Sequence, residues 1–422
     1  MRIGDEITIG PTELVAGGDS LARVDGLPIF TANVFPGDVA RVRIVELKKG
    51  FARGELIAID SPSLLRRASP CPIAEECGGC DWTALRLDAQ LEAKKRILTE
   101  SLRRIGKFDL ATLPPITLHP SPLNYRLRSR LHRDGDAVGF YATQSHRVVP
   151  LAHECEVVGV ETARASEFAQ PLIRPSGTFS PLRGAKAYIG PRPAERGEGG
   201  RRPGEGPGHS ENAAAGAKPQ VATPDDALEL WEIDGRLVTE GEFTIAGYHV
   251  NTESFFQVNR HLLGTMLRLV SGIASHTNTK HTALDLYSGV GFFSRPLARL
   301  FEQVTAIEGS PASHAAAKRN AAANVELVQA PVEHWIDHMP RTDFVFLDPP
   351  RSGTRRNVID AIAHKTNEQI CFLACDPVTF ARDASRLTAS GWRLRTLDLL
   401  DLFPNTHHVE TLSSFERASS PS

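Results

Sequence analysis

Hydrophobic and polar positions alternate over much of the first sixth of the chain. Short Val- and Ile-rich runs occur at residues 6–9, 39–45 and 55–59, and Gly-Asp or Pro-Gly-Asp turns separate them. Because successive side chains of a strand point to opposite faces, these runs predict strands with one buried face. Short strands bounded by such turns are typical of a five-stranded β-barrel of the OB type, which often binds single-stranded nucleic acid. We therefore expect an OB-like barrel domain over residues 1–62.

The pattern changes to a helical period after the cysteine-rich segment that follows. Apolar residues recur every three or four positions over residues 88–108, at Leu91, Leu98 and Leu102 among others. This spacing predicts an amphipathic helix. Its basic residues are expected to form an exposed edge: Lys94, Lys95, Arg103 and Arg104.

The C-terminal part of the chain contains longer apolar runs that alternate with helix-permissive segments. Runs at 283–286, 304–307, 343–347 and 369–374 predict buried parallel strands. Strands that alternate with helices are typical of an α/β fold with a doubly wound, Rossmann-like sheet, which we expect over residues 227–422. Ligands of such sheets bind beyond the carboxyl ends of the strands. The candidate site therefore comprises the residues at these ends: Asp285, Glu308, Asp348 and Cys375.

Two glycines follow the first of these strands and indicate a close backbone approach to a ligand. Gly289 and Gly291 form a G-x-G pattern, and Ser294 stands where a dinucleotide-binding fold has its third glycine. S-adenosylmethionine has no pyrophosphate, so it fits this pattern better than a nicotinamide dinucleotide. Glu308 is placed to bind the ribose hydroxyls of an adenosine-containing ligand. A nicotinamide cofactor and ordinary turn glycines remain the alternatives.

Four of the six cysteines form a further candidate site. Cys71, Cys77 and Cys80 lie within ten residues, and Cys155 follows downstream. Disulfides are rare in a reducing cytoplasm, so thiolate ligation of a metal is the preferred interpretation. Zinc and a [4Fe–4S] cluster both fit four thiolates, and unrelated buried cysteines are the alternative. We expect a small central domain over residues 63–184 to carry this site.

The same central segment contains three arginines at a spacing of two residues. On one strand Arg126, Arg128 and Arg130 would share a face, which predicts a phosphate-binding surface for RNA, with a merely solvated face as the alternative. The composition then changes to Gly, Pro, Arg and Glu over residues 185–226. A segment of this composition cannot bury a core, so we expect a disordered insertion there.

Bulk composition limits the class of protein. The chain is 41% hydrophobic and 23% charged, with a formal net charge of −2. This balance is typical of a globular protein and argues against general nucleic-acid avidity, while it leaves local basic patches open. No run of about eighteen apolar residues and no N-terminal signal sequence are found, so we expect a cytoplasmic protein that does not bind a membrane.

Taken together, the motifs resemble those of the RNA uracil-5-methyltransferase family over nearly the whole chain. The N-terminal barrel is similar to the TRAM domain of that family, and the four cysteines match the iron–sulfur motif of its 23S ribosomal RNA branch. The remaining motifs follow in the family's order: Phe-Gln-Val-Asn at 256–259, Asp-Leu-Tyr-Ser-Gly-Val-Gly at 285–291, Asp-Pro-Pro-Arg-Ser-Gly at 348–353, Ala-Cys-Asp-Pro-Val-Thr at 374–379 and Phe-Pro-Asn-Thr-His-His-Val-Glu at 403–410. Asn405 stands where the family usually has histidine, and Asp376 where it has asparagine.

The resemblance implies a role for each motif. Cys375 would be the nucleophile that attacks C6 of uracil, and Glu410 the base that removes the C5 proton. At Cys375 the N-terminus of the following helix would stabilise the thiolate. The resemblance implies that one set of residues binds S-adenosylmethionine: Gln257, Asp285, Tyr287, Gly289, Gly291, Glu308 and Asp348. It also implies a [4Fe–4S] cluster at Cys71, Cys77, Cys80 and Cys155.

The expected activity is transfer of a methyl group from S-adenosylmethionine to C5 of a uridine in 23S ribosomal RNA. Transfer RNA is the alternative substrate, and a non-catalytic RNA-binding module is the alternative of another class. Intact Cys375 and Glu410 favour an enzyme. We expect a monomer whose partner is its RNA substrate.

Overall fold

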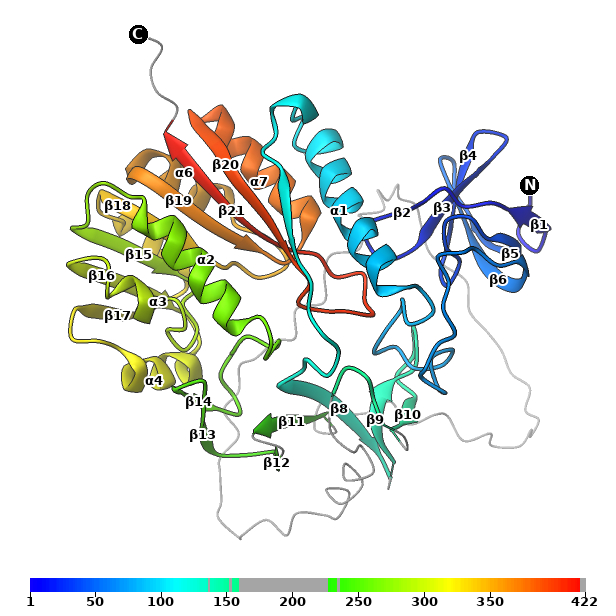
Figure 1. The fold of residues 1–422 in the computed structure, drawn as a ribbon, viewed down its shortest axis with the longest axis horizontal. Coiled ribbons are helices and arrows are strands. Elements are labelled where there is room, and N and C mark those ends of the chain that lie inside the picture. The colour runs from blue at the N-terminus through cyan, green and yellow to red at the C-terminus, as the bar shows by residue number, and fades with distance from the viewer. Residues whose placement is uncertain (136, 152–153, 159–226, 234–235, 418–422) are drawn as a thin grey trace, which may run out of the picture.

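The computed structural model describes residues 1–422 except 136, 152–153, 159–226, 234–235 and 418–422. Among the described residues, the strands form sheets of six, five, two and eight strands. Figure 1 shows the six-stranded and eight-stranded sheets at opposite ends of the molecule, with helix α1 (Leu87–Arg104) between them. The insertion expected at 185–226 lies outside the described residues.

The N-terminal sheet confirms the alternating pattern read from the sequence. In β5 (Val39–Leu47) the side chains of Ala40, Val42 and Ile44 are buried and the residues between them are exposed. The strand order is β1-β5-β6-β4-β3-β2. Six strands are present instead of the five expected, because Glu13–Leu14 forms a short additional strand at one edge. The other strands are β1 (Glu6–Ile9), β3 (Ser20–Val24), β4 (Leu27–Thr31) and β6 (Ala52–Ser61).

Helix α1 packs against helix α7 (Pro377–Ala389) and buries the apolar face that its period predicts. It ends at Arg104, earlier than expected, because Lys107 has a φ of +59°, which a right-handed helix does not allow. Lys94 was expected on the exposed basic edge, and this is wrong. Its side chain is fully buried, and its Nζ lies 2.6 Å from Oδ1 of Asp401.

The central sheet combines strands from both sides of residues 159–226. β11 (Ala227–Ile233) pairs antiparallel with β8 (Arg128–Asp134), and the strand order is β10-β9-β8-β11-β12. A separate hairpin of β13 and β14 leads into the large sheet. The bounds of these strands are β9 (Ala137–Tyr141), β10 (Val148–Pro150), β12 (Arg236–Val238), β13 (Glu242–Ile245) and β14 (Tyr248–Asn251).

The eight-stranded sheet is the doubly wound sheet predicted from the sequence. Its strand order is β17-β16-β15-β18-β19-β21-β20-β7, so the order reverses between β15 and β18. The first five strands of this order are mutually parallel, and β21 runs antiparallel to both of its neighbours. The strands are β7 (Ile116–His119), β15 (Thr282–Leu286), β16 (Gln303–Glu308), β17 (Val325–Gln329), β18 (Thr342–Leu347), β19 (Thr366–Ala374), β20 (Trp392–Leu400) and β21 (Glu410–Arg417).

Helices cover both faces of this sheet and bury a separate core on each. In β18, Val345 and Leu347 pack into a core with residues of α1, α6 and α7, whereas Phe344 and Phe346 pack into a core with residues of α2, α3 and α4. Alternate residues of the strand point to opposite faces, and both faces are buried, so the strand sequence is apolar throughout. The helices are α2 (Leu263–Ser275), α3 (Ser294–Leu297), α4 (Pro311–Asn320), α5 (Val332–Trp335) and α6 (Arg356–Lys365), with 3₁₀ turns at Leu110–Thr112 and Ile336–His338.

In the part of the chain that the structure describes, no helix has the length and apolarity needed to span a membrane.

Candidate active site and cysteine pocket

Four of the predicted site residues lie where neighbouring strands of the large sheet end. Asp285 lies in β15, Asp348 follows β18, Cys375 follows β19 and Glu410 begins β21. Ala374 is the register partner of Thr411, so the antiparallel pairing of β19 and β21 brings Cys375 and Glu410 side by side. The sheet therefore places a thiol beside a carboxyl group, although 34 residues separate them in the sequence.

A pocket lies between the glycine loop and the Phe-Gln-Val-Asn segment. Of the seven predicted cofactor-binding residues, four line it: Gln257, Tyr287, Gly289 and Asp348. Nε2 of Gln257 donates a hydrogen bond of 2.9 Å to Oδ2 of Asp348. Gly289 and Gly291 have φ values of +56° and +82°, which explains the need for glycine in this turn. The buried Oγ of Ser288, which also lines the pocket, has no hydrogen-bond partner among the described residues and is available to a ligand.

The other three predicted cofactor-binding residues are Asp285, Gly291 and Glu308, and their hydrogen bonds hold the glycine loop in its conformation. Oε2 of Glu308 accepts a hydrogen bond of 2.8 Å from the backbone N–H of Gly289. Gly291 closes the turn with a hydrogen bond of 2.9 Å from its N–H to the carbonyl of Ser288. Asp285 is fully buried and accepts a hydrogen bond from the hydroxyl of Ser294, while burial raises the pKa of its carboxyl group to about 7. Ser294, at the third glycine position, thus supports the strand end.

The Cys375 thiol lines a second pocket. Burial, together with the carboxyl groups of Glu410 and Asp348, raises its pKa to about 12. The expectation of a stabilised thiolate is therefore not met in the protein without substrate, because burial and two acidic neighbours raise the pKa of the thiol. Burial also raises the pKa of Glu410 well above its ordinary value and that of Asp348 to about 7.

Arg351 is a functional candidate that the sequence analysis did not single out, although it belongs to the Asp-Pro-Pro-Arg motif. Its guanidinium group lines the Cys375 pocket and lowers the pKa of both Cys375 and Glu410, against the effect of burial. It lies 3.1 Å from Nε2 of His408. A guanidinium group only donates, so this nitrogen accepts. Burial and the neighbouring Arg351 lower the pKa of His408 to about 2, which keeps the imidazole neutral.

The N-terminal sheet also reaches the Cys375 pocket. The turn between β2 and β3 contributes Ala16 and Gly17 to its lining. Trp82 Nε1 donates a hydrogen bond of 3.1 Å to the carbonyl of Gly18, which fixes this turn against the cysteine-rich segment. The pocket is therefore built from residues of both ends of the chain.

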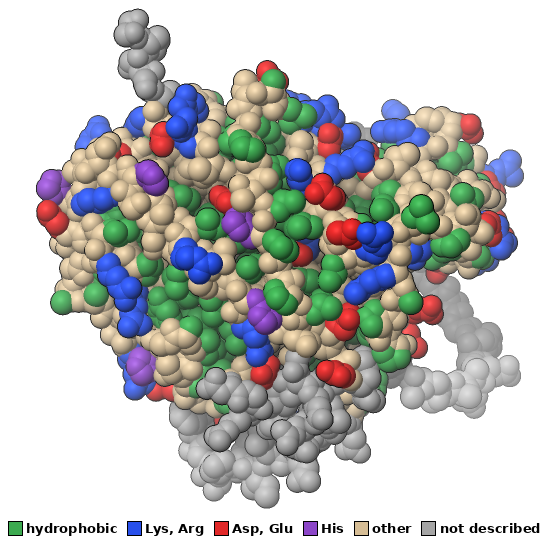
Figure 2. Space-filling view, viewed as in Figure 1, with side chains coloured by type: hydrophobic (Ala, Val, Ile, Leu, Met, Phe, Trp, Pro, Cys, Tyr) green, Lys and Arg blue, Asp and Glu red, His purple; other side chains and the backbone are tan. Residues whose placement is uncertain are grey.

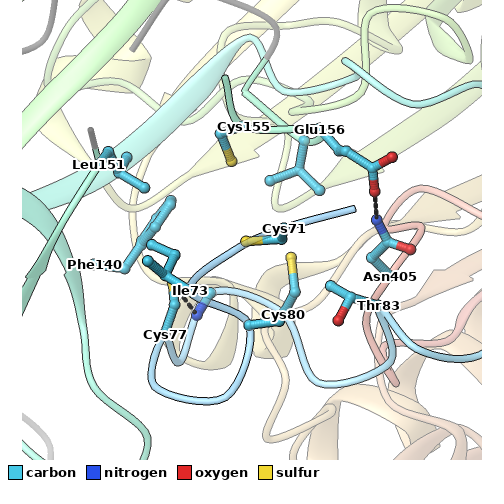
Figure 3. A pocket seen from close by; sticks show the side chains of 13 residues that line it. Cys71, Ile73, Cys77, Cys80, Thr83, Phe140, Leu151, Cys155, Glu156 and Asn405 are labelled. Atoms are coloured by element: carbon cyan, nitrogen blue, oxygen red, sulfur yellow. Dashed lines mark hydrogen bonds between the residues drawn. The ribbon is translucent and has the colours of Figure 1, made fainter. Parts of the chain in front are cut away.

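The four predicted cysteine ligands line one pocket. Figure 3 shows the side chains of Cys71, Cys80 and Cys155 directed into one space. Burial raises the pKa of Cys71, Cys77 and Cys80, so these groups are thiols in the absence of a metal. Among the residues described, no three His, Cys, Asp or Glu side chains are arranged to hold a single metal ion.

The three predicted RNA-binding arginines are placed differently from one another. Arg128 and Arg130 lie two apart in β8, but Arg126 precedes this strand, so the expectation that all three share one strand face is wrong. Arg126 is half-buried, and its guanidinium group lies 5.5 Å from the ring centroid of Phe140, beside the cysteine pocket. On the face shown in Figure 2, Lys and Arg side chains alternate with Asp and Glu, in keeping with the net charge of −2.

Comparisons with known proteins agree with this arrangement. A family profile described as tRNA (uracil-5-)-methyltransferase matches residues 233–339 and 339–417, and the TRAM domain profile matches residues 3–57. An RNA methyltransferase of Gloeobacter violaceus is 33% identical, over 98% of this chain and 97% of its own length. This chain belongs to the RNA uracil-5-methyltransferase family. It is accordingly an S-adenosylmethionine-dependent RNA methyltransferase.

Other relatives of this RNA uracil-5-methyltransferase differ in their substrates. The 23S rRNA (uracil(1939)-C(5))-methyltransferase of a Shewanella species is 27% identical, over 95% of this chain and 93% of its own. The structure of the Pyrococcus abyssi tRNA (uracil-54, C5)-methyltransferase, solved with S-adenosyl-L-homocysteine, superposes with a TM-score of 0.66 at 21% identity. That superposition covers 96% of this chain and 99% of the other, and it confirms the fold.

Proposed function

We propose that this methyltransferase modifies C5 of a uridine in 23S ribosomal RNA, with Cys375 as the nucleophile and Glu410 as the base. The observation that carries the assignment is the register of β19 and β21, which sets the two groups beside each other at the end of the sheet. A nucleophile and a base must both reach one uracil ring, at C6 and C5. Their shared position next to Asp348, which also lines the cofactor pocket, supports one continuous site.

The chemistry requires these residue types because C5 of uracil is a poor nucleophile. The Cys375 thiolate forms a bond to C6, and the electrons of the C5–C6 double bond move toward the C4 carbonyl as an enolate. C5 then accepts the methyl group. Glu410 removes the C5 proton, the double bond re-forms, and the bond between sulfur and C6 breaks, which releases the thiolate. Arg351 favours the anionic form of both groups.

We propose that S-adenosylmethionine binds in the pocket of Gln257, Tyr287, Gly289 and Asp348, with Asp285, Gly291 and Glu308 holding the loop in shape. The bound cofactor supplies an electrophilic sulfonium methyl group. The unpaired Ser288 hydroxyl and the hydrogen bond between Gln257 and Asp348 support a polar ligand there. A nicotinamide cofactor is disfavoured because Ser294 stands at the third glycine position, where dinucleotide-binding folds need glycine for close packing of the helix.

We further propose that Cys71, Cys77, Cys80 and Cys155 hold a [4Fe–4S] cluster. Four cysteines around one pocket support four-sulfur ligation, which a zinc ion and a [4Fe–4S] cluster both fit, and the resemblance of the cysteine motif to that of the 23S ribosomal RNA branch favours the cluster. Methyl transfer moves no electrons, so the cluster would have a structural role. Iron and sulfide analysis of anaerobically purified protein tests this proposal, and stoichiometric zinc would contradict it.

The RNA substrate would be held by the β8 surface, where Arg128 and Arg130 are two residues apart, and by Arg126 near the cysteine pocket. A target uridine must leave its stack to enter the Cys375 pocket, which favours a site in single-stranded or loop RNA. The Shewanella relative and the four cysteines favour 23S ribosomal RNA over transfer RNA as the substrate.

The test uses anaerobically purified protein and labelled S-adenosylmethionine, with 23S ribosomal RNA and transfer RNA that both lack 5-methyluridine. Nucleosides are separated after digestion. Label in 5-methyluridine from ribosomal RNA alone is the expected result. Label from transfer RNA alone would support the proposed reaction and refute the assignment of 23S ribosomal RNA as the substrate. A Cys375→Ala protein serves as the matched control, and full activity of that variant would refute the proposed mechanism.

A further inference from the structure

The loop between β20 and β21 leads into the proposed base, Glu410, and Asn405 lies buried within it. Asn405 is fully buried and has a φ of +66°, a left-handed conformation that few residues other than glycine and asparagine adopt readily. Glu410 follows five residues later as the first residue of β21. The loop leads directly into Glu410, so its path contributes to the position of the carboxyl group together with the pairing of β21 with β19 and β20.

Both ends of the Asn405 amide are hydrogen-bonded to groups far away in the sequence. Oδ1 accepts from Arg67 at 2.9 Å and from Nε2 of Gln90 at 3.1 Å, and Nδ2 donates to Oε2 of Glu156 at 3.1 Å. The backbone takes part as well. Its N–H donates to Oε1 of Gln90 at 2.8 Å, and its carbonyl accepts from the N–H groups of Asp81 and Trp82 at 3.2 and 3.0 Å.

These partners flank the proposed cluster ligands. Asp81 directly follows Cys80, and Glu156 directly follows Cys155. Asn405 and Glu156 themselves line the four-cysteine pocket, and Figure 3 shows the hydrogen bond between them at its edge. The conformation of the cysteine-rich segments and that of the base-carrying loop are thus fixed by one shared set of hydrogen bonds.

We infer that Asn405 is a positioning residue that couples the four-cysteine pocket to the catalytic base Glu410. The inference rests on the roles proposed above for Cys375, Glu410 and the cysteines. Buried amide groups that lose their partners are costly, so the network has one favoured arrangement and transmits a displacement of the cysteine-rich segments to the loop. A cluster at the four cysteines would then have a structural role in the reaction, since it would hold the loop that leads to Glu410.

The coupling predicts which step depends on Asn405. Cys375 follows β19 and is not carried by this loop, which lines the Cys375 pocket with His407, His408 and Val409, so formation of the bond between its sulfur and C6 should depend less on the network than release does. Release does require it, because Glu410 must reach the C5 proton before the double bond re-forms and the sulfur leaves. Loss of the Asn405 amide is expected to trap the covalent RNA adduct.

The decisive variant is Asn405→Gly, because glycine keeps the positive φ and removes only the side-chain hydrogen bonds. Single-turnover reactions with substrate RNA are followed by denaturing gel, which gives separate rates for the appearance and the decay of the covalent enzyme–RNA band. We expect the adduct to form within about twofold of the wild-type rate and to decay at least about tenfold more slowly, as for a displaced general base. Asn33→Gly is the matched control, since exposed Asn33 also has a positive φ, of +60°.

A second variant and a second measurement guard against simple misfolding. Arg67→Met removes one donor to Asn405 from outside the loop and should slow decay in the same direction. Hydrogen exchange measures the loop directly: the amides of residue 403 and residues 405–410 should exchange faster in Asn405→Gly and in Cys155→Ser than in wild type. Adduct decay at the wild-type rate, or formation and decay slowed equally, would overturn the inference. A wild-type protein that forms neither adduct nor 5-methyluridine would overturn the proposed function instead.

Discussion

The buried ion pair between Lys94 and Asp401 allows a quantitative test of how α1 is held against the active-site end of the large sheet. The Lys94 side chain is 0% exposed and that of Asp401 is 6% exposed, with 2.6 Å between Nζ and Oδ1. Nζ also donates a hydrogen bond of 2.9 Å to the carbonyl of Phe403. In Lys94→Met, the Asp401 carboxylate stays buried without its cation, which costs about 3–5 kcal/mol in the free energy of unfolding.

Urea unfolding followed by tryptophan fluorescence measures this loss. With a slope of about 3–5 kcal/mol per M of urea, as expected for a chain of this size, the loss lowers the midpoint by about 1 M. Lys94→Met/Asp401→Leu should recover most of the stability, because it removes both charges and leaves none uncompensated. The control is Arg103→Met on the same helix, whose ion pair with Glu100 is exposed and should contribute less than about 1 kcal/mol. If Lys94→Met destabilised no more than this control, or if the double variant lost the sum of both single effects, our interpretation of the pair would be refuted.

Three further changes test the active site. Glu410→Gln should form the covalent RNA adduct and accumulate it, with turnover reduced about 10²–10⁴-fold, as gel shift and 5-methyluridine yield will show. Arg351→Met removes the cation that lowers the pKa of Cys375, so the rise of adduct formation with pH should move to higher pH; an unchanged profile would contradict the role of Arg351. In Gly18→Ala the new Cβ would clash with Oδ2 of Asp81 at a φ of +93°, so the turn or the Asp81 side chain must move, and weaker substrate RNA binding or slower adduct formation is expected while α-helix content stays constant.

The large sheet was predicted well because each of its strands is marked by a local apolar run in the sequence. Apolar runs that stop at Asp348 and Cys375 indicate buried parallel strands, and the order of the motifs indicates which strand ends meet. The division into domains at residues 62, 184 and 226 stays a prediction, as do the roles of the individual site residues. The adjacency of Cys375 and Glu410 needed the antiparallel register of β19 and β21, which no local pattern contains.

The errors have a common physical origin in long-range burial. Lys94 follows the basic edge of an amphipathic pattern, but its exposure depends on Asp401, more than 300 residues away in the sequence. Arg126 fits a period of two, yet β8 begins only at Arg128. At Cys375 a helix N-terminus predicts a stabilised thiolate, whereas burial and the neighbouring acids raise the pKa to about 12. In each case the environment of the residue is set by neighbours in the tertiary structure, which the local sequence pattern does not contain.

The position of β7 at the edge of the large sheet has a consequence for how this protein can be synthesised and dissected. β7 pairs in parallel with β20, and Ile116 is the register partner of Leu397. A ribosome therefore releases this strand long before its partner exists, so the edge of the sheet closes only after residues 392–400 have been synthesised, and such non-local pairing is slow. A fragment that starts at residue 227 would leave the edge of β20 bare and prone to pair with other chains.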